Sequence, residues 1–176
     1  MASGETPLND FGLLIAYLVP GATVLLGLSP FSGTLRVWLA STPANVPTIG
    51  GFLYLTVAAL AAGMVVSAVR WVLIDTLHSY TGLPSPVLNF AKLGQNVEAF
   101  SLLIEIHYRH YQFYSNMFVA TAIAYVSYRT TLDGILSIGW MDVGFVLLEI
   151  ILFVTSRDTL RKYYTRGKQV LGGSRQ

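Results

Sequence analysis

The sequence predicts an all-α polytopic membrane protein, and three observations lead to this prediction. The 176 residues are 53% hydrophobic and only 11% charged, whereas soluble domains carry roughly 25% charged residues. Four stretches approach the roughly 20 apolar residues that a helix needs to cross a bilayer. The basic residues gather in a few segments, although the formal net charge is only +2. We therefore expect one integral membrane domain, residues 1–176, with four transmembrane helices.

The four expected spans differ in character. The first has no charged residue, and Pro20 predicts a kink in it; because no Lys or Arg precedes it, we expect a retained span and not a signal peptide. The second is the most uniformly apolar and ends at Arg70, a residue type suited to a headgroup boundary. The third is rich in tyrosine, and the fourth contains two acids. The spans are residues 11–28, 50–70, 111–129 and 134–156, with a short interfacial helix near residues 35–40.

The basic residues predict the orientation of the chain. Six of the eleven Lys and Arg residues lie in the tail, residues 157–176, and three lie between the second and third spans. The other side of the membrane would hold only Arg36 and Arg129. Because basic loops are retained on the cytoplasmic side, we expect both termini and the segment 71–110 to be cytoplasmic.

The segment before the third span carries the densest polar and aromatic chemistry, in the stretch IHYRHYQFYSN from residue 106 to 116. Helical spacing predicts that a helix starting near Asn89 or Asn96 runs directly into the third span. Three interpretations are open: a collar at the membrane interface, a face that binds an anionic ligand, and a metal site, which needs three or four ligands. The candidate ligand face comprises Lys92, His107, Tyr108, Arg109, His110 and Tyr111.

Two acids and one amide fall inside the expected spans. Asp142 and Glu149 are seven residues apart, which is about two helical turns, so they project from nearly the same face. Such acids usually face a bundle interior or a water-filled cavity, which makes them candidate pore residues. The alternative is that a hydrogen-bonding partner such as Tyr125 neutralises them and they hold helices together. Asn116 is expected to bond a neighbouring helix.

The second span carries a stripe of small residues, and the chain lacks the common catalytic motifs. Ala59, Gly63 and Ser67 form a stripe that lets helix backbones approach closely, within one chain or between chains. No G-x-S-x-G, H-E-x-x-H or phosphate-binding glycine loop occurs, and Asp75 with His78 is a weak pattern for acid–base chemistry. Since the chain also has no cysteine, we expect no catalytic residue, no cofactor and no metal ligand.

The first span, DFGLLIAYLVPG, together with four spans in 176 residues and a short cytoplasmic helical segment, resembles small bacterial membrane effectors of anti-phage defence, such as the Hailong type. In that type, a membrane channel is held in check by the nucleotide product of a partner nucleotidyltransferase. The resemblance implies a bacterial inner-membrane channel that forms a homo-oligomer and binds an oligonucleotide or nucleotide made by a partner enzyme. It covers the architecture of the whole chain, and no family residue is carried over.

These observations rank three functions. The first is an oligomeric channel or membrane-perturbing effector, regulated through its cytoplasmic aromatic and basic segment. The alternative is a non-conducting membrane scaffold or accessory subunit whose polar residues only hold helices together. The third is a membrane-embedded lipid-modifying enzyme.

Overall fold

A computed structural model describes residues 8–39, 49–132 and 138–172. The described residues form helices and contain no strand, which confirms the all-α prediction. Two π-helical turns, η2 (Trp71–Asp75) and η4 (Ile104–Tyr108), join α3 to α4 and α5 to α6, and η1 (Ser29–Phe31) and η3 (Phe90–Lys92) are 3-10 turns. The α-helices are α1 (Leu8–Leu28), α2 (Gly33–Leu39), α3 (Ile49–Arg70), α4 (Thr76–Tyr80), α5 (Leu93–Leu103), α6 (Arg109–Thr130) and α7 (Trp140–Leu171).

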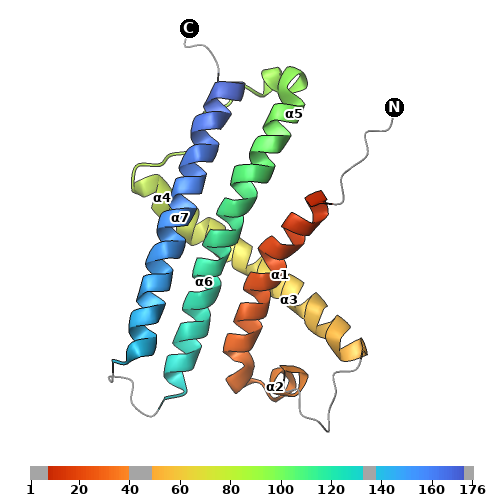
Figure 1. The fold of residues 1–176 in the computed structure, drawn as a ribbon, viewed down its shortest axis with the longest axis vertical. Helices are drawn as coiled ribbons and strands as arrows, with labels where there is room; N and C mark the ends of the chain where they lie inside the picture. The colour runs from red at the N-terminus through yellow and green to blue at the C-terminus, as the bar shows by residue number, and fades with distance from the viewer. Residues whose placement is uncertain (1–7, 40–48, 133–137, 173–176) are drawn as a thin grey trace.

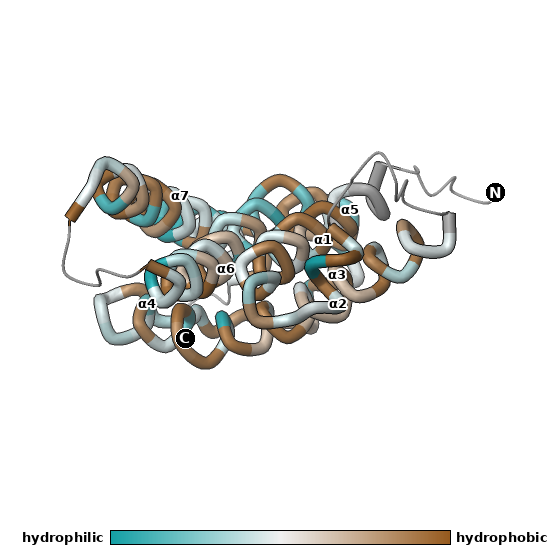
Figure 2. The backbone as a smooth tube through the Cα atoms, turned by 90° about the horizontal axis from the view of Figure 1, so that it is seen from below, coloured by the Kyte–Doolittle hydropathy of each residue, from teal (hydrophilic) through white to brown (hydrophobic). Residues whose placement is uncertain are grey.

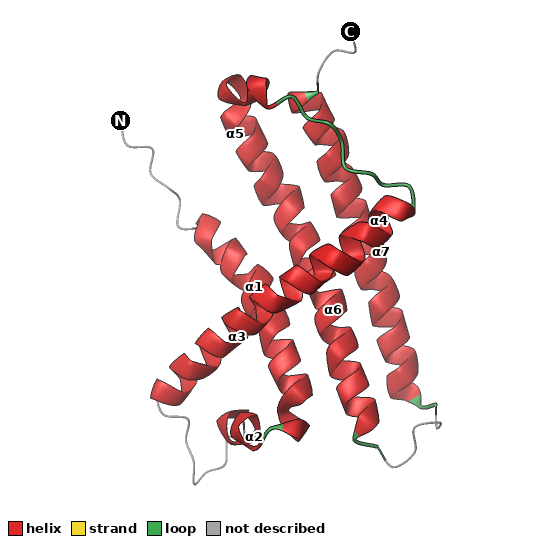
Figure 3. Ribbon diagram, turned by 180° about the vertical axis from the view of Figure 1, so that it is seen from behind, coloured by secondary structure: helices red, strands yellow, loops and turns green. Residues whose placement is uncertain are grey.

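The helices form an open bundle around α6 (Figure 1). Helix α6 packs between α1 and α7, and α3 packs against α1 and α6 while crossing them obliquely (Figure 3). The expected helix leading into the third span is confirmed, because α5, η4 and α6 follow one another without a break. Helix α1 begins and α7 ends towards the same end of the molecule, where α5 and α7 lie against each other.

Two helical stretches are long and apolar enough to cross a membrane, Leu14–Phe31 and Gly50–Tyr80. They correspond to the first two expected spans. Of the four spans expected, the described structure therefore supports two. Helix α6 is less apolar because its polar side chains are spread along it. Helix α7 carries Asp142 in its first turn and Glu149 within its apolar part, and Figure 2 shows hydrophobic and hydrophilic residues interleaved along it. The expected start of the fourth span, at Gly134, lies outside the described residues.

The junction of α1 with α6 depends on a proline. Pro20 lies inside α1 and has no N–H, so it cannot donate to the carbonyl of Ala16 four residues earlier. Asn116 of α6 supplies the missing donor, because its Nδ2 lies 3.1 Å from the Ala16 oxygen. Both Ala16 and Asn116 are fully or almost fully buried. The expectation that Asn116 bonds a neighbouring helix is confirmed, and the reason is a backbone group that Pro20 leaves unpaired.

The junction of α1 with α3 depends on two glycines. Gly21 follows Pro20 in α1, and Gly63 belongs to the facing part of α3. A Cβ placed on Gly21 would lie 1.7 Å from the carbonyl oxygen of Ala59, and one on Gly63 would lie 2.0 Å from that of Tyr17. Such distances are far below van der Waals contact, so these backbones touch directly. The stripe predicted on the second span is thus used within the chain at Ala59 and Gly63, while Ser67 is half-buried.

The segment between α4 and α5 is hydrogen-bonded to the end of α7. Gly82 has a φ of 91°, and the bonds from its N–H to Ser79 and from the next N–H to His78 form the Schellman motif that ends a helix. The chain then runs back along α7 (Figure 3). There the Asn89 N–H donates to the last helical carbonyl, Leu171, at 2.8 Å. Residues 157–171, expected only as a basic tail, continue α7 as a helix.

The proline and the amide can be tested as a pair. Asn116→Ala should lower the free energy of unfolding by about 1–3 kcal/mol, because it leaves the buried Ala16 carbonyl without a donor. In a Pro20→Ala background the same change should be much less harmful, since replacing the proline restores the backbone N–H that bonds this carbonyl. Thermal unfolding of the four proteins in detergent measures the coupling. Equal losses in both backgrounds would contradict this explanation.

Candidate functional site

Buried polar side chains gather where η2 meets the start of α6. Arg70 Nη1 donates to Asp75 Oδ1 at 3.0 Å, and the hydroxyl of Tyr111 donates to the same oxygen. The guanidinium carbon of Arg70 lies 5.1 Å from the centre of the Tyr111 ring, within the range of a cation–π interaction. Arg70 and Tyr111 are 3% and 1% exposed. With His78 and Ser156, these residues form what we call the inner polar cluster.

The π-helical turn explains how Arg70 reaches Asp75. Residues five apart on an α-helix point about 140° away from each other. In η2 the helix is wound with i to i+5 geometry, which places such residues above one another. The second π turn, η4, lies directly before α6 and rotates the residues that follow it. π turns occur frequently at functional sites, and here two of them flank one buried cluster.

His78 and Ser156 link α4 to α7 at the inner polar cluster. His78 Nε2 lies 3.2 Å from Ser156 Oγ, and this hydroxyl also donates to the Phe153 carbonyl at 2.9 Å. In this arrangement the imidazole donates to the hydroxyl, which is the reverse of what a nucleophilic serine requires. Both side chains are completely buried. Asp75 bonds Arg70 and Tyr111 and has no hydrogen bond to His78 among those described, so the two do not form an acid–base pair.

The residues predicted as one ligand face are divided between two sides of the helix. His107 faces α7, where its Nε2 lies 2.6 Å from Arg166 Nη1. Tyr108 also faces α7, with its ring centre 5.1 Å from that of Tyr163. Tyr111 is buried in the inner polar cluster and offers no surface for stacking.

Arg109 and His110 lie on the other side and face α1. They line a cavity of about 390 Å³ together with Gly12, Phe113, Tyr114 and Glu105, among others. A Cβ on Gly12 would lie 3.3 Å from Arg109 Nη1, so the absence of a side chain there gives the guanidinium room.

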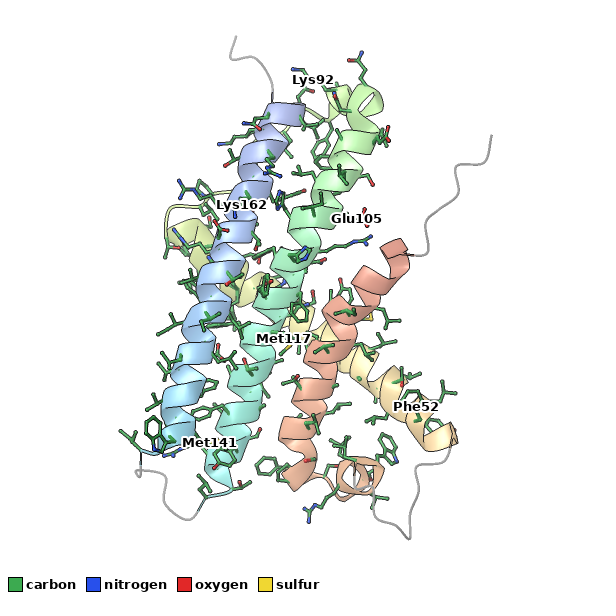
Figure 4. The ribbon with its side chains drawn as sticks, viewed as in Figure 1. Phe52, Lys92, Glu105, Met117, Met141 and Lys162 are labelled. Atoms are coloured by element: carbon green, nitrogen blue, oxygen red, sulfur yellow. The ribbon has the colours of Figure 1, made fainter. Side chains whose placement is uncertain are left out.

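Lys92 is the last residue of η3, directly before α5, and lies away from Glu105 (Figure 4). Its Nζ donates to the Gly172 carbonyl at 2.8 Å, where it balances the negative end of the α7 dipole. The structure therefore brings together Arg109 and His110, and places Lys92, His107, Tyr108 and Tyr111 elsewhere.

The two acids of α7 both face α6, as their spacing predicts. Asp142 accepts from Arg129 at 3.1 Å, from the Tyr125 hydroxyl and from the Gly139 N–H at 2.5 Å. It lies in the first turn of α7 and caps that helix, and Tyr125, one of the partners expected for it, is among the groups that bond it.

Glu149 lies in the apolar part of α7. Thr121 donates to its Oε1 at 2.6 Å, and its Oε2 is buried without a described hydrogen-bonding partner.

The comparisons with known proteins add no relative. No protein-family model, no curated protein and no solved structure matches the chain. Across residues 8–39, 49–132 and 138–172, no group of three or more His, Cys, Asp or Glu side chains is arranged to hold a metal.

Sequence reasoning missed two partners from α7. Arg166 and Ser156 lie far from the residues they contact, at separations of 59 and 78 positions. The only signal was the recurrence of Leu160, Gly167 and Leu171 at helical spacing within the basic tail, and all three are buried. That pattern indicates a packed helix face.

The pairing of His107 predicts a pH dependence. Burial lowers the pKa of His107 from its ordinary value of 6.5, and Arg166 and Lys162 lower it further. The unfolded chain therefore binds a proton more readily than the folded protein, so stability should decline as the pH falls below about 6.5. Above that pH the contribution is constant.

Melting temperatures between pH 8 and pH 5 test this prediction. His107→Gln should flatten the decline, whereas His110→Gln, at an exposed position, should leave it in place. A decline of unchanged slope in His107→Gln would assign it to other groups.

Proposed function

We propose that the chain is an integral membrane protein with four spans that acts as a homo-oligomeric channel or membrane-perturbing effector. The observation that carries the membrane assignment is the distribution of polarity. Arg70, His78 and Asn116 are buried, together with several serines, while large apolar side chains cover the outside. Soluble proteins bury their apolar residues and expose most charged and amide side chains. The reverse arrangement here is best explained by lipid as the surrounding solvent. The exposed apolar residues include Phe52, Leu53, Val57, Met64 and Val65 on α3, and Val146, Leu147, Ile150, Ile151 and Val154 on α7.

The third and fourth spans are part of the proposal. The polar atoms of α6 and α7 are turned towards each other or towards α1, as the bonds of Asn116, Asp142 and Glu149 illustrate. A helix whose polar groups are bonded inside a bundle can span a bilayer despite its lower hydropathy. Figure 4 supports this division, with Phe52, Met117 and Met141 in the proposed membrane part and Lys92 and Lys162 beyond it.

We place both termini in the cytoplasm of a bacterial inner membrane. The charge bias supports the orientation, and the bacterial source follows from the resemblance to defence effectors. Arg70, Arg109 and Arg157 belong to three different helical segments that meet the proposed inner boundary, while Arg36 and Arg129 belong to the opposite side.

Conduction is supported by Glu149. Its Oε2 is buried without a described hydrogen-bonding partner, and acids within spans commonly mark ion pathways. Because four spans are too few to enclose a pathway, an ion path would run between copies. In this proposal Glu149 lies near that path.

A non-conducting scaffold is the second candidate, and a specific observation favours it. Asp142 and Asn116 are bonded within the chain, where they hold helices together. A lipid-modifying enzyme draws no support from the inner polar cluster, because its serine and histidine are completely buried.

Regulation is proposed at the cavity lined by Arg109 and His110. A guanidinium group binds phosphate, and Phe113 and Tyr114 in the same wall offer rings for stacking. Glu105 in this wall selects against a bare anion. These features support a phosphate-bearing ligand with an aromatic group, such as a nucleotide or oligonucleotide made by a partner enzyme.

Mass and ion flux separate the channel from the scaffold. The purified protein should form an oligomer in detergent by light scattering and release ions from liposomes. Glu149→Gln should keep the oligomer mass and change the flux by about tenfold, because a charge near the path is removed. Thr159→Ala, outside the proposed path, serves as the control. An assembled protein without flux, or a strict monomer, would favour the scaffold.

The ligand cavity is tested by a conservative change. Arg109→Lys should weaken binding of short oligonucleotides about tenfold, since Lys cannot reproduce the two parallel bonds of Arg. Arg161→Lys, at an exposed position on α7, should leave the affinity unchanged. Binding should also weaken as salt rises. Salt-insensitive binding, or none by the unmodified protein, would leave the membrane collar as the better interpretation.

A further inference from the structure

A second cavity, separate from the one at Arg109, borders the inner polar cluster at Asp75. It measures about 580 Å³ and is enclosed by one face of η2 and α4, by the segment after Gly82, and by Tyr164 of α7. It therefore sits where the apolar stretch Gly50–Tyr80 ends, at the inner boundary of the proposed membrane. The functions proposed above make no use of it.

Asp75 supplies the negative charge of this cavity. Both of its described hydrogen bonds, from Arg70 and from Tyr111, go to Oδ1. Its side chain remains 29% exposed and lines the cavity, so Oδ2 is the oxygen available to a ligand. Asp75 is the one charged residue among the described residues lining the cavity. One carboxylate is too few for a hard metal ion, which needs six or more oxygen ligands, but it suits a single ammonium group.

Aromatic rings surround the same space. Trp71, Tyr80 and Tyr164 line the cavity, and Trp71 and Tyr80 are 67% and 85% exposed. Rings of this kind attract ammonium groups through their faces. Exposed Trp and Tyr at the end of a span are also typical of the headgroup level of a membrane.

The rest of the wall suits the remaining parts of a lipid. Thr76, Ser79 and Ser85 offer hydroxyl groups that can donate to phosphate oxygens. Arg157 lies at the adjoining turn, where it donates to the Thr81 hydroxyl at 2.5 Å and to the Thr81 carbonyl at 2.6 Å, so a positive charge stands near the rim. Val72 adds an apolar side from which an acyl chain could enter.

We propose that this cavity binds the headgroup of a phospholipid that carries both an ammonium and a phosphate, as phosphatidylethanolamine does. The ammonium bonds Asp75 Oδ2 and packs on the rings, and the phosphate lies among the hydroxyl groups towards Arg157. Since Asp75 also holds Arg70 and Tyr111, bound lipid would stabilise the junction of η2 with α6.

Native mass spectrometry of the full chain in detergent tests the proposal. Phosphatidylethanolamine should bind about tenfold more tightly than phosphatidylglycerol, which lacks the ammonium. Asp75→Asn should remove most of this preference. Because Asp75→Asn also disturbs its bonds to Arg70 and Tyr111, Trp71→Leu provides a second variant that leaves those bonds in place, and it should weaken binding about fivefold.

Trp140→Leu is the matched control, because Trp140 is 89% exposed on α7 but lies at the opposite end of the proposed membrane part. It should bind phosphatidylethanolamine as the unmodified protein does. Equal binding of the two lipids, or unchanged binding in both Asp75→Asn and Trp71→Leu, would overturn the proposal. Displacement by soluble phosphoethanolamine at the affinity of the lipid would assign the ligand to solution and overturn the lipid source. None of these outcomes depends on ion flux or oligonucleotide binding.

Discussion

The hydrogen bond from Asn116 to the carbonyl of Ala16 is the interaction on which the arrangement of α1, α3 and α6 depends. Pro20 removes a backbone donor from the middle of α1, and in a water-free setting an unpaired carbonyl is strongly destabilising. Asn116 satisfies that carbonyl only if α6 lies against this turn of α1. One residue after the proline, Gly21 admits the backbone of α3. Three helices therefore meet at a point set by one proline, one amide and one glycine.

From that junction the polar groups are distributed in two layers. Where η2 meets the start of α6, the inner polar cluster combines a cation, a carboxylate and aromatic rings in a buried space. Towards the other end, Arg129 and Asp142 form an ion pair that closes the first turn of α7. Glu149 lies between them with one oxygen bonded to Thr121. Large apolar residues of α3 and α7 face outwards, so the charged groups of both layers lie inside the bundle.

Local sequence patterns predicted the helices well and their partners poorly. Apolar length located α1 and α3, and helical spacing located the run from α5 into α6, because these depend on neighbours within one segment. His107 and Arg109 were predicted to belong to one ligand face, but they are two residues apart, which is about 200° around a helix, so they point to opposite sides. The partnership of Asn116 with Ala16 spans 100 positions, and no local pattern indicates which carbonyl an amide will meet.

Helix α7 differs from its neighbours in being one uninterrupted helix of 32 residues, which corresponds to a length of about 48 Å. Helix α3 and the α5–α6 run each contain a π turn beside the inner polar cluster, whereas α7 passes the cluster without one. Helix α7 is therefore expected to bend less than α3–α4 and α5–α6, which each contain a π turn. A tilt of about 5° about its first turn would carry its C-terminal end through roughly 4 Å for that length. Such a tilt would displace Arg166 and Leu171 more than Glu149, because both lie farther from the start of the helix.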